Sequence, residues 1–115
     1  MKVLIVEDEI FAALHLESAI ADLGCEVIGI APDRCTALEL AKEKPDLAFV
    51  DLNLRDGLTG PDIARSLANQ FGARVYVLSA NPGQMGCNLN GLIGVIDKPW
   101  QEAELAQIVR SAEDG

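Results

Sequence analysis

Short aliphatic runs alternate along this chain with segments whose apolar residues recur at helical spacing. Continuous runs of this kind are typical of strands that are buried on both faces of a sheet. Five runs predict strands, at residues 2–6, 26–30, 47–50, 75–78 and 94–96. Strands that alternate with helices form βαβ units. The pattern therefore predicts an α/β fold, with one doubly wound parallel sheet covered by helices on both faces.

Capping residues mark the ends of the helices that this pattern predicts. The segments concerned are residues 10–23, 33–44, 60–70 and 101–112. Gly24 stands where a helix C-cap glycine belongs, and Asp33 is able to cap the second helix. Pro45 follows the end of that helix, and Thr59 is able to cap the third.

Length, charge and hydropathy narrow the class of protein. A chain of 115 residues, half of them hydrophobic, fits one domain, taken as residues 1–115. Its net charge of −9 opposes direct binding to nucleic acid. No apolar run approaches the roughly 20 residues that span a membrane, and no signal-peptide pattern follows Met1. We therefore expect a cytoplasmic protein without a membrane segment.

The cysteines and the histidine do not form a recognisable metal site. Cys25, Cys35 and Cys87 lack CxxC spacing, and His15 is the single histidine of the chain. The cysteines are best interpreted as apolar fillers in a reducing compartment. His15 falls in a predicted helix, which favours a solvated or partly packed side chain over a phosphohistidine.

Polar residues that could bind a ligand or take part in a reaction follow four of the predicted strands. Glu7 and Asp8 follow the first strand, Asp51 the third, Ser79 the fourth and Lys98 the fifth. Each alone would be a solvated loop residue, but ligands of parallel sheets bind at the carboxyl ends of the strands. Clustered carboxylates need a cation to neutralise them, and oxygen ligands suit Mg²⁺. A lysine and a hydroxyl at the same place would bind a phosphate.

Four short motifs at these positions resemble those of response-regulator receiver domains, which have a flavodoxin-like fold. They are VEDE at residues 6–9, VDLNL at 50–54, LSA at 78–80 and DKP at 97–99. Each motif alone is weak, but the set of four in this order is specific. The resemblance covers essentially the whole chain.

The resemblance implies a magnesium site beside a phosphoacceptor. Asp51 would be the phosphoacceptor, and Asp8 and Asp51 would ligate Mg²⁺. Glu7 would hold a metal-bound water, and the backbone carbonyl of Asn53 would complete the site.

It also implies roles for the residues around the phosphoryl group. Ser79 and Lys98 would contact that group, and Lys98 would pair with Asp51 before phosphorylation. Asn81, together with Asn53, would flank the approach of the hydrolytic water. Pro99 and Gly57 match the family's proline after the lysine and its loop glycine.

Two departures from the family concern the switch. The family usually carries Tyr or Phe three residues before the lysine, where this chain has Val95. The segment between Ser79 and Lys98 is shorter than is typical, and residues 81–91 are rich in Gly, Asn and Pro. These residues are poor helix formers. We therefore expect the fourth helix of the family to be short, distorted or mobile here.

The expected function is that of a stand-alone, phosphorylatable receiver without an output domain. The donor would be a phosphohistidine on a sensor histidine kinase or a histidine phosphotransfer protein, and the signal would pass to a downstream protein target. The chain would catalyse its own phosphorylation and slow autodephosphorylation, with no separate substrate. The last helix could support a homodimer.

Three other functions compete with this one. A haloacid-dehalogenase-type phosphatase needs a second aspartate two residues after the first, where Asn53 stands. A nucleotide binder would need glycines or hydroxyls at residues 7–9, which are acidic. The remaining alternative is a pseudo-receiver that is not phosphorylated and acts as a protein-binding module. The intact acidic pair at residues 7–8, together with Asp51, Ser79 and Lys98, argues against it.

Overall fold

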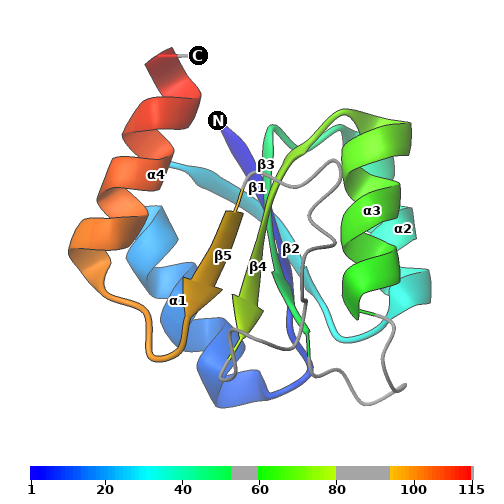
Figure 1. Cartoon of the computed structure of the whole chain (residues 1–115), viewed down its shortest axis with the longest axis horizontal. Coiled ribbons are helices and arrows are strands. Elements are labelled where there is room, and N and C mark those ends of the chain that lie inside the picture. Colours follow the sequence, from blue (N-terminus) through cyan, green and yellow to red (C-terminus); the bar gives the residue numbers. More distant parts are fainter. Residues whose placement is uncertain (53–59, 80–93, 115) are drawn as a thin grey trace.

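A five-stranded parallel sheet forms the centre of the molecule (Figure 1). The computed structural model describes residues 1–52, 60–79 and 94–114. The strand order is β2-β1-β3-β4-β5. The strands are β1 (Lys2–Val6), β2 (Glu26–Ala31), β3 (Leu47–Asp51), β4 (Arg74–Ser79) and β5 (Gly94–Asp97). The predicted fold class is confirmed.

Helices cover both faces of this sheet. In Figure 1, α1 and α4 lie on one side, and α2 and α3 lie on the other. The helical elements are α1 (Ile10–Asp22), α2 (Arg34–Leu40), the 3₁₀ turn η1 (Ala41–Glu43), α3 (Gly60–Phe71) and α4 (Glu102–Asp114). No helix in these described segments is long and apolar enough to cross a membrane.

The second predicted α-helix ends earlier than the position before Pro45, where its end was expected. Asp33 caps it as expected, since its Oδ1 accepts a hydrogen bond from the Thr36 amide at 2.8 Å. The α-helix then tightens into the 3₁₀ turn, and Lys44 adopts a left-handed conformation with φ of 59°. Lys44 precedes Pro45, and the residue before a proline is disfavoured in the α region. The proline therefore ends the 3₁₀ turn.

The other boundaries lie within two residues of the predicted ones. Gly24 has a φ of 87°, as expected for a glycine just beyond a helix C-terminus. The predicted cap at Thr59 and the predicted weak fourth helix, within residues 80–93, lie outside the described residues.

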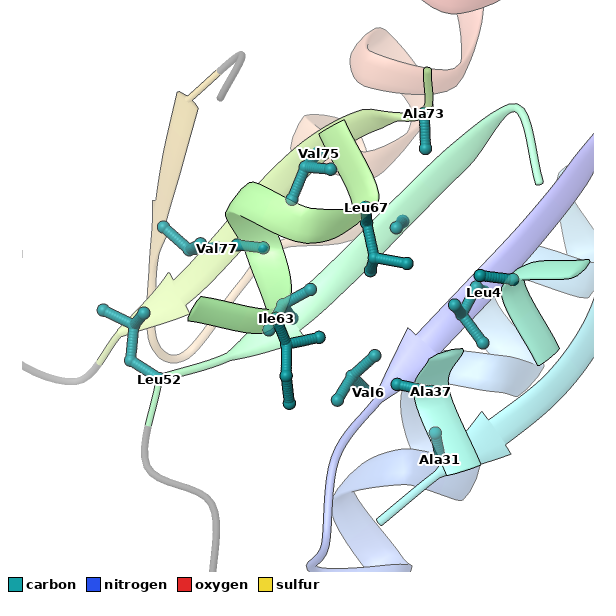
Figure 2. Packing of buried hydrophobic residues seen from close by; sticks show 14 residues of the cluster. Leu4, Val6, Ala31, Ala37, Leu52, Ile63, Leu67, Ala73, Val75 and Val77 are labelled. Carbon is teal, nitrogen blue, oxygen red and sulfur yellow. The ribbon is translucent and has the colours of Figure 1, made fainter. Parts of the chain in front are cut away.

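Alternate residues of the strands feed two separate cores. On the α2 and α3 side, Leu4, Val6 and Val77 pack with Ile63 and Leu67 (Figure 2). The other face carries a second buried cluster, which includes Val3, Ile5, Phe49, Leu16, Ile20, Leu105 and Val109. Because β1 and β3 are buried on both faces, their backbones are held firmly where the chain leaves the sheet.

The strand order brings the carboxyl ends of β1, β3 and β4 together. Val6 is paired with Val50, and Asp51 with Leu78. From β1 the chain continues to β2 on one side of the sheet, while β3 lies on the other side. A crevice at such a switch point is the usual ligand site of an open parallel sheet.

Leu4→Ala should lower the free energy of unfolding by about 2–5 kcal/mol, because it leaves a cavity in a fully buried position. Leu14, on α1, is 46% exposed, so Leu14→Ala should cost less than about 1 kcal/mol. Urea denaturation of both variants measures the difference. Equal losses would contradict the assignment of Leu4 to the core.

Candidate functional site

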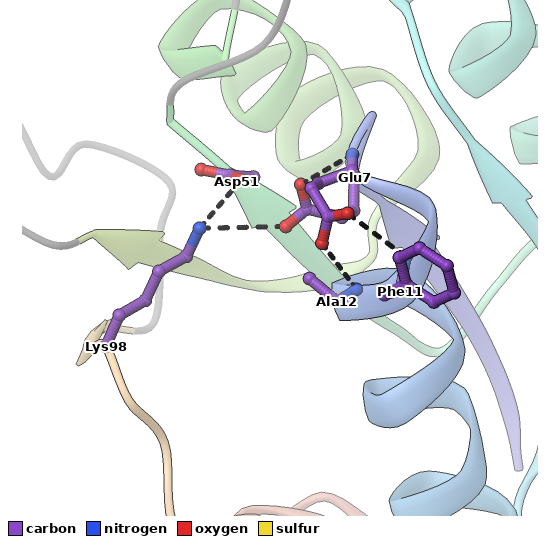
Figure 3. A network of polar contacts seen from close by, with 6 residues as sticks. Glu7, Phe11, Ala12, Asp51 and Lys98 are labelled. Carbon is purple, nitrogen blue, oxygen red and sulfur yellow. Dashed lines mark hydrogen bonds and ion pairs between the residues drawn. The ribbon is translucent and has the colours of Figure 1, made fainter.

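Three charged side chains converge at the carboxyl ends of β1, β3 and β5 (Figure 3). Asp51 is the last residue of β3 and is only 3% exposed, while Glu7 directly follows β1 and is 4% exposed. Lys98 directly follows β5 and is partly buried. Residues far apart in the sequence therefore share one crevice because parallel strands end at the same edge.

Lys98 forms the ion pairs that join these three residues. Its Nζ lies 2.8 Å from Asp51 Oδ2 and 3.6 Å from Glu7 Oε2. One ammonium group thus faces two buried carboxylates, as the dashed lines in Figure 3 show. Removing the ammonium group of Lys98 would leave the buried carboxylates without a compensating positive charge.

Glu7 carries a perturbed carboxyl group. Its Oε1 accepts a hydrogen bond from the Glu9 amide at 3.1 Å. Burial, and after it the hydrogen bond and negative charge of the nearby Asp51 carboxyl, raise the pKa of Glu7 to about 7, against the opposing effects of the Glu9 amide and Lys98. A proton on Glu7 near neutral pH follows first from the burial of its carboxyl group and then from the Asp51 carboxyl beside it.

Asp8 adds a third carboxylate to the crevice. Glu7, Asp8 and Asp51 each offer one carboxylate oxygen, and these three oxygens lie within 4.8 Å of one another. Oxygen donors at this spacing suit a hard divalent cation. The donor set therefore fits Mg²⁺, and the repulsion among the carboxylates would be relieved by such an ion.

Glu9 fixes the loop that carries Glu7 and Asp8, a role that the sequence did not reveal. It is the N-cap of α1, and its carboxylate accepts hydrogen bonds from the Phe11 amide at 3.3 Å and the Ala12 amide at 2.7 Å. Ser, Thr, Asp and Asn are the residues preferred at this position. A glutamate within an acidic triplet therefore gave no capping signal.

Ser79 is the last residue of β4, with 1% of its surface exposed. Its carbonyl oxygen accepts a hydrogen bond from the Lys98 amide at 2.9 Å. Val95 lies in β5 opposite Val77, and Pro99 is exposed after a cis peptide bond. The ends of β4 and β5 are therefore tied together where Lys98 enters the crevice.

Three predicted residues lie outside the part of the chain that the structure describes. Asn53 and Gly57 fall within residues 53–59, and Asn81 falls within residues 80–93. Their predicted roles stay predictions.

An apolar pocket adjoins the charged crevice. It has a volume of about 350 Å³, and its lining includes Glu7, Lys98, Leu16, His15 and Trp100. The rings of His15 and Trp100 are in contact, with centroids 4.7 Å apart. Sequence reasoning did not find this pair, because nothing in a helical histidine indicates a partner at the other end of the chain.

Comparison with known proteins gives one consistent family. The chain matches the model of the response regulator receiver domain over residues 3–110. The phyllosphere-induced regulator PhyR of Methylorubrum extorquens is 32% identical over 120 residues, which cover 96% of this chain and 43% of PhyR. The chain spans less than half the length of the curated relatives that it matches.

Solved structures of receiver domains resemble this chain as well. The receiver domain of PhyR from Erythrobacter litoralis superimposes with a TM-score of 0.86 at 32% identity, covering 97% of this chain and 88% of that one. The receiver domain of a sensor histidine kinase from Pseudomonas aeruginosa shares the fold, with a TM-score of 0.80 at 23% identity, over 99% of this chain and 98% of that one.

Glu7→Gln should remove a pH-dependent part of the stability of the metal-free protein. The pKa of Glu7 rises from its ordinary value of 4.5 to about 7 on folding, so the folded state binds the proton more tightly. The stability due to this proton is fully present below pH 4.5 and is lost as pH rises through about 7.

Chemical denaturation at several pH values, in buffer containing a chelator, measures this effect. The unfolding free energy of wild type relative to Glu7→Gln should fall by up to about 3 kcal/mol across that range. Glu26→Gln, at an exposed position at the opposite end of the sheet, should keep the wild-type pH dependence. An unchanged slope in Glu7→Gln would refute the perturbed carboxyl.

Proposed function

Because this chain belongs to the response regulator receiver domain family, we propose that it accepts a phosphoryl group on Asp51. The donor is a phosphohistidine on a sensor histidine kinase or a histidine phosphotransfer protein. The observation that carries the proposal is the pairing of Asp51 with Lys98 at 2.8 Å, beside the carboxylates of Glu7 and Asp8. A buried strand-end carboxylate with a cation next to it is suited to phosphoryl chemistry.

The transfer asks mainly for positioning and for neutralisation of charge. A carboxylate oxygen of Asp51 attacks the phosphorus and forms the new P–O bond. The P–N bond of the donor breaks, and its electron pair returns to the imidazole nitrogen. Lys98 stabilises the charge that spreads over the three other phosphoryl oxygens, because its ammonium already faces Asp51.

Mg²⁺ is the cofactor that this donor set fits. Asp8 and Asp51 would ligate it, Glu7 would hold one of its waters, and the backbone carbonyl of Asn53 would complete the set. When bound, the ion neutralises the clustered carboxylates and the incoming phosphate. The Pseudomonas receiver domain was solved with a magnesium ion in its active-site cleft.

Ser79 is the residue that we expect to transmit the change. Its hydroxyl would turn toward a phosphoryl oxygen on Asp51 and move the residues that follow β4, Asn81 among them. Val95 offers no aromatic ring to follow this movement, so the signal would leave through the residues that follow Ser79. Hydrolysis of the acyl phosphate, with Asn53 and Asn81 beside the water, would reset the protein.

The output of this switch would be a protein contact in the cytoplasm. A chain with a net charge of −9 is poorly suited to nucleic acid, so the downstream target would be another protein. A homodimer through α4 remains part of the proposal.

Asp51→Asn should abolish phosphorylation. Acetyl phosphate with Mg²⁺ should add one phosphate to wild type, since acetyl phosphate supplies the same phosphoryl group without a partner protein. Asp46→Asn is the matched control, because Asp46 is an exposed aspartate just before the other end of β3. Intact mass spectrometry detects the added phosphate in wild type and in both variants. Phosphorylated Asp51→Asn would overturn the proposal.

Asp8→Asn should weaken Mg²⁺ binding and yet stabilise the metal-free protein. The substitution removes a charge from the acidic cluster and relieves repulsion worth about 1–2 kcal/mol. Calorimetric titration with Mg²⁺ and thermal denaturation in chelator measure the two effects. Wild-type Mg²⁺ affinity in Asp8→Asn would show that the ion binds elsewhere.

A further inference from the structure

The contact between His15 and Trp100 joins the two elements that supply the opposite charges of the site. Trp100 lies two residues after Lys98, and His15 lies on α1, the helix that follows Glu7 and Asp8. The ring centroids are 4.7 Å apart and the planes are inclined at 39°. Trp100 also packs against the buried cluster between the sheet, α1 and α4. The contact therefore fixes the segment after β5 against α1.

The position of Lys98 depends on how the chain is held just before and just after it. Before it, the hydrogen bond from its amide to the Ser79 carbonyl holds β5 to β4. After it, Trp100 is the large side chain that anchors the segment. The Lys98 side chain itself is 30% exposed and borders the pocket of about 350 Å³. A flexible four-carbon stem beside such a space is not held by its own packing.

We propose that Trp100, whose ring contacts that of His15, is a positioning residue that holds Lys98 against Asp51 during phosphoryl transfer. This inference rests on the proposed function. Trp100 does not touch the reacting atoms. It acts through Lys98, whose ammonium must meet the charge that develops on the phosphoryl oxygens. Small displacements of such a group slow a reaction strongly.

A double-mutant cycle separates this role from a merely structural one. Trp100→Ala should lower the rate constant for phosphorylation by acetyl phosphate about 10-fold. Trp100→Phe should restore most of the rate, and His15→Ala, at an exposed position that threatens the fold less, should show a smaller loss. Leu14→Ala, next to His15 on α1 but outside the pocket lining, should react like wild type.

The decisive arm repeats Trp100→Ala in a Lys98→Ala background. If Trp100 acts through Lys98, the second substitution should cause no further loss. A loss of equal size in both backgrounds would show a general structural effect and would overturn the inference.

A second measurement needs no phosphorylation. In the unphosphorylated protein, the NMR order parameter of the Lys98 Cε should fall in Trp100→Ala and His15→Ala and stay unchanged in Leu14→Ala. An unchanged value in both pocket variants would also overturn the inference. If wild type accepts no phosphate on Asp51, the proposed function fails, while this measurement still shows whether the two rings restrain Lys98.

Discussion

One ammonium group shared by two buried carboxylates is the interaction on which the site depends. Lys98 Nζ lies 2.8 Å from Asp51 and 3.6 Å from Glu7, and both carboxylates are almost completely buried. Burying these charges costs desolvation energy, which a single cation offsets only in part. Asp8 adds further negative charge at the same point. The crevice is therefore poised to bind cations and to respond when its charge changes.

The central strands of the sheet hold these carboxylates close together. β1 and β3 are neighbours at the centre, and apolar layers on both faces hold them in place. Their carboxyl ends cannot separate to relieve the repulsion between Glu7 and Asp51 without disturbing both cores. The favourable packing of the two cores thus holds several charged groups close together, which a flexible loop would not do.

The fold was largely predictable because its signals are local. Continuous aliphatic runs marked each strand to within one residue, and Asp33 and Gly24 marked helix ends. The end of α2 was placed wrongly because Pro45 marks where helical backbone must stop, whereas the α-helix had already tightened into the 3₁₀ turn η1. The residues of the crevice were predictable for a different reason. They directly follow strands, so topology alone brings Glu7, Asp51 and Lys98 together.

Two contacts were beyond such reasoning, for different reasons. The cap formed by Glu9 is local but uses a residue with weak capping preference, whereas the contact of His15 with Trp100 depends on how α1 lies against the segment after β5. The most direct test of the central claim is borohydride reduction of the phosphorylated protein, which converts a phosphoaspartate to homoserine. Sequencing of the tryptic peptide 43–55, which holds both Asp46 and Asp51, should find homoserine at position 51. Homoserine at position 46, or at neither position, would contradict the account.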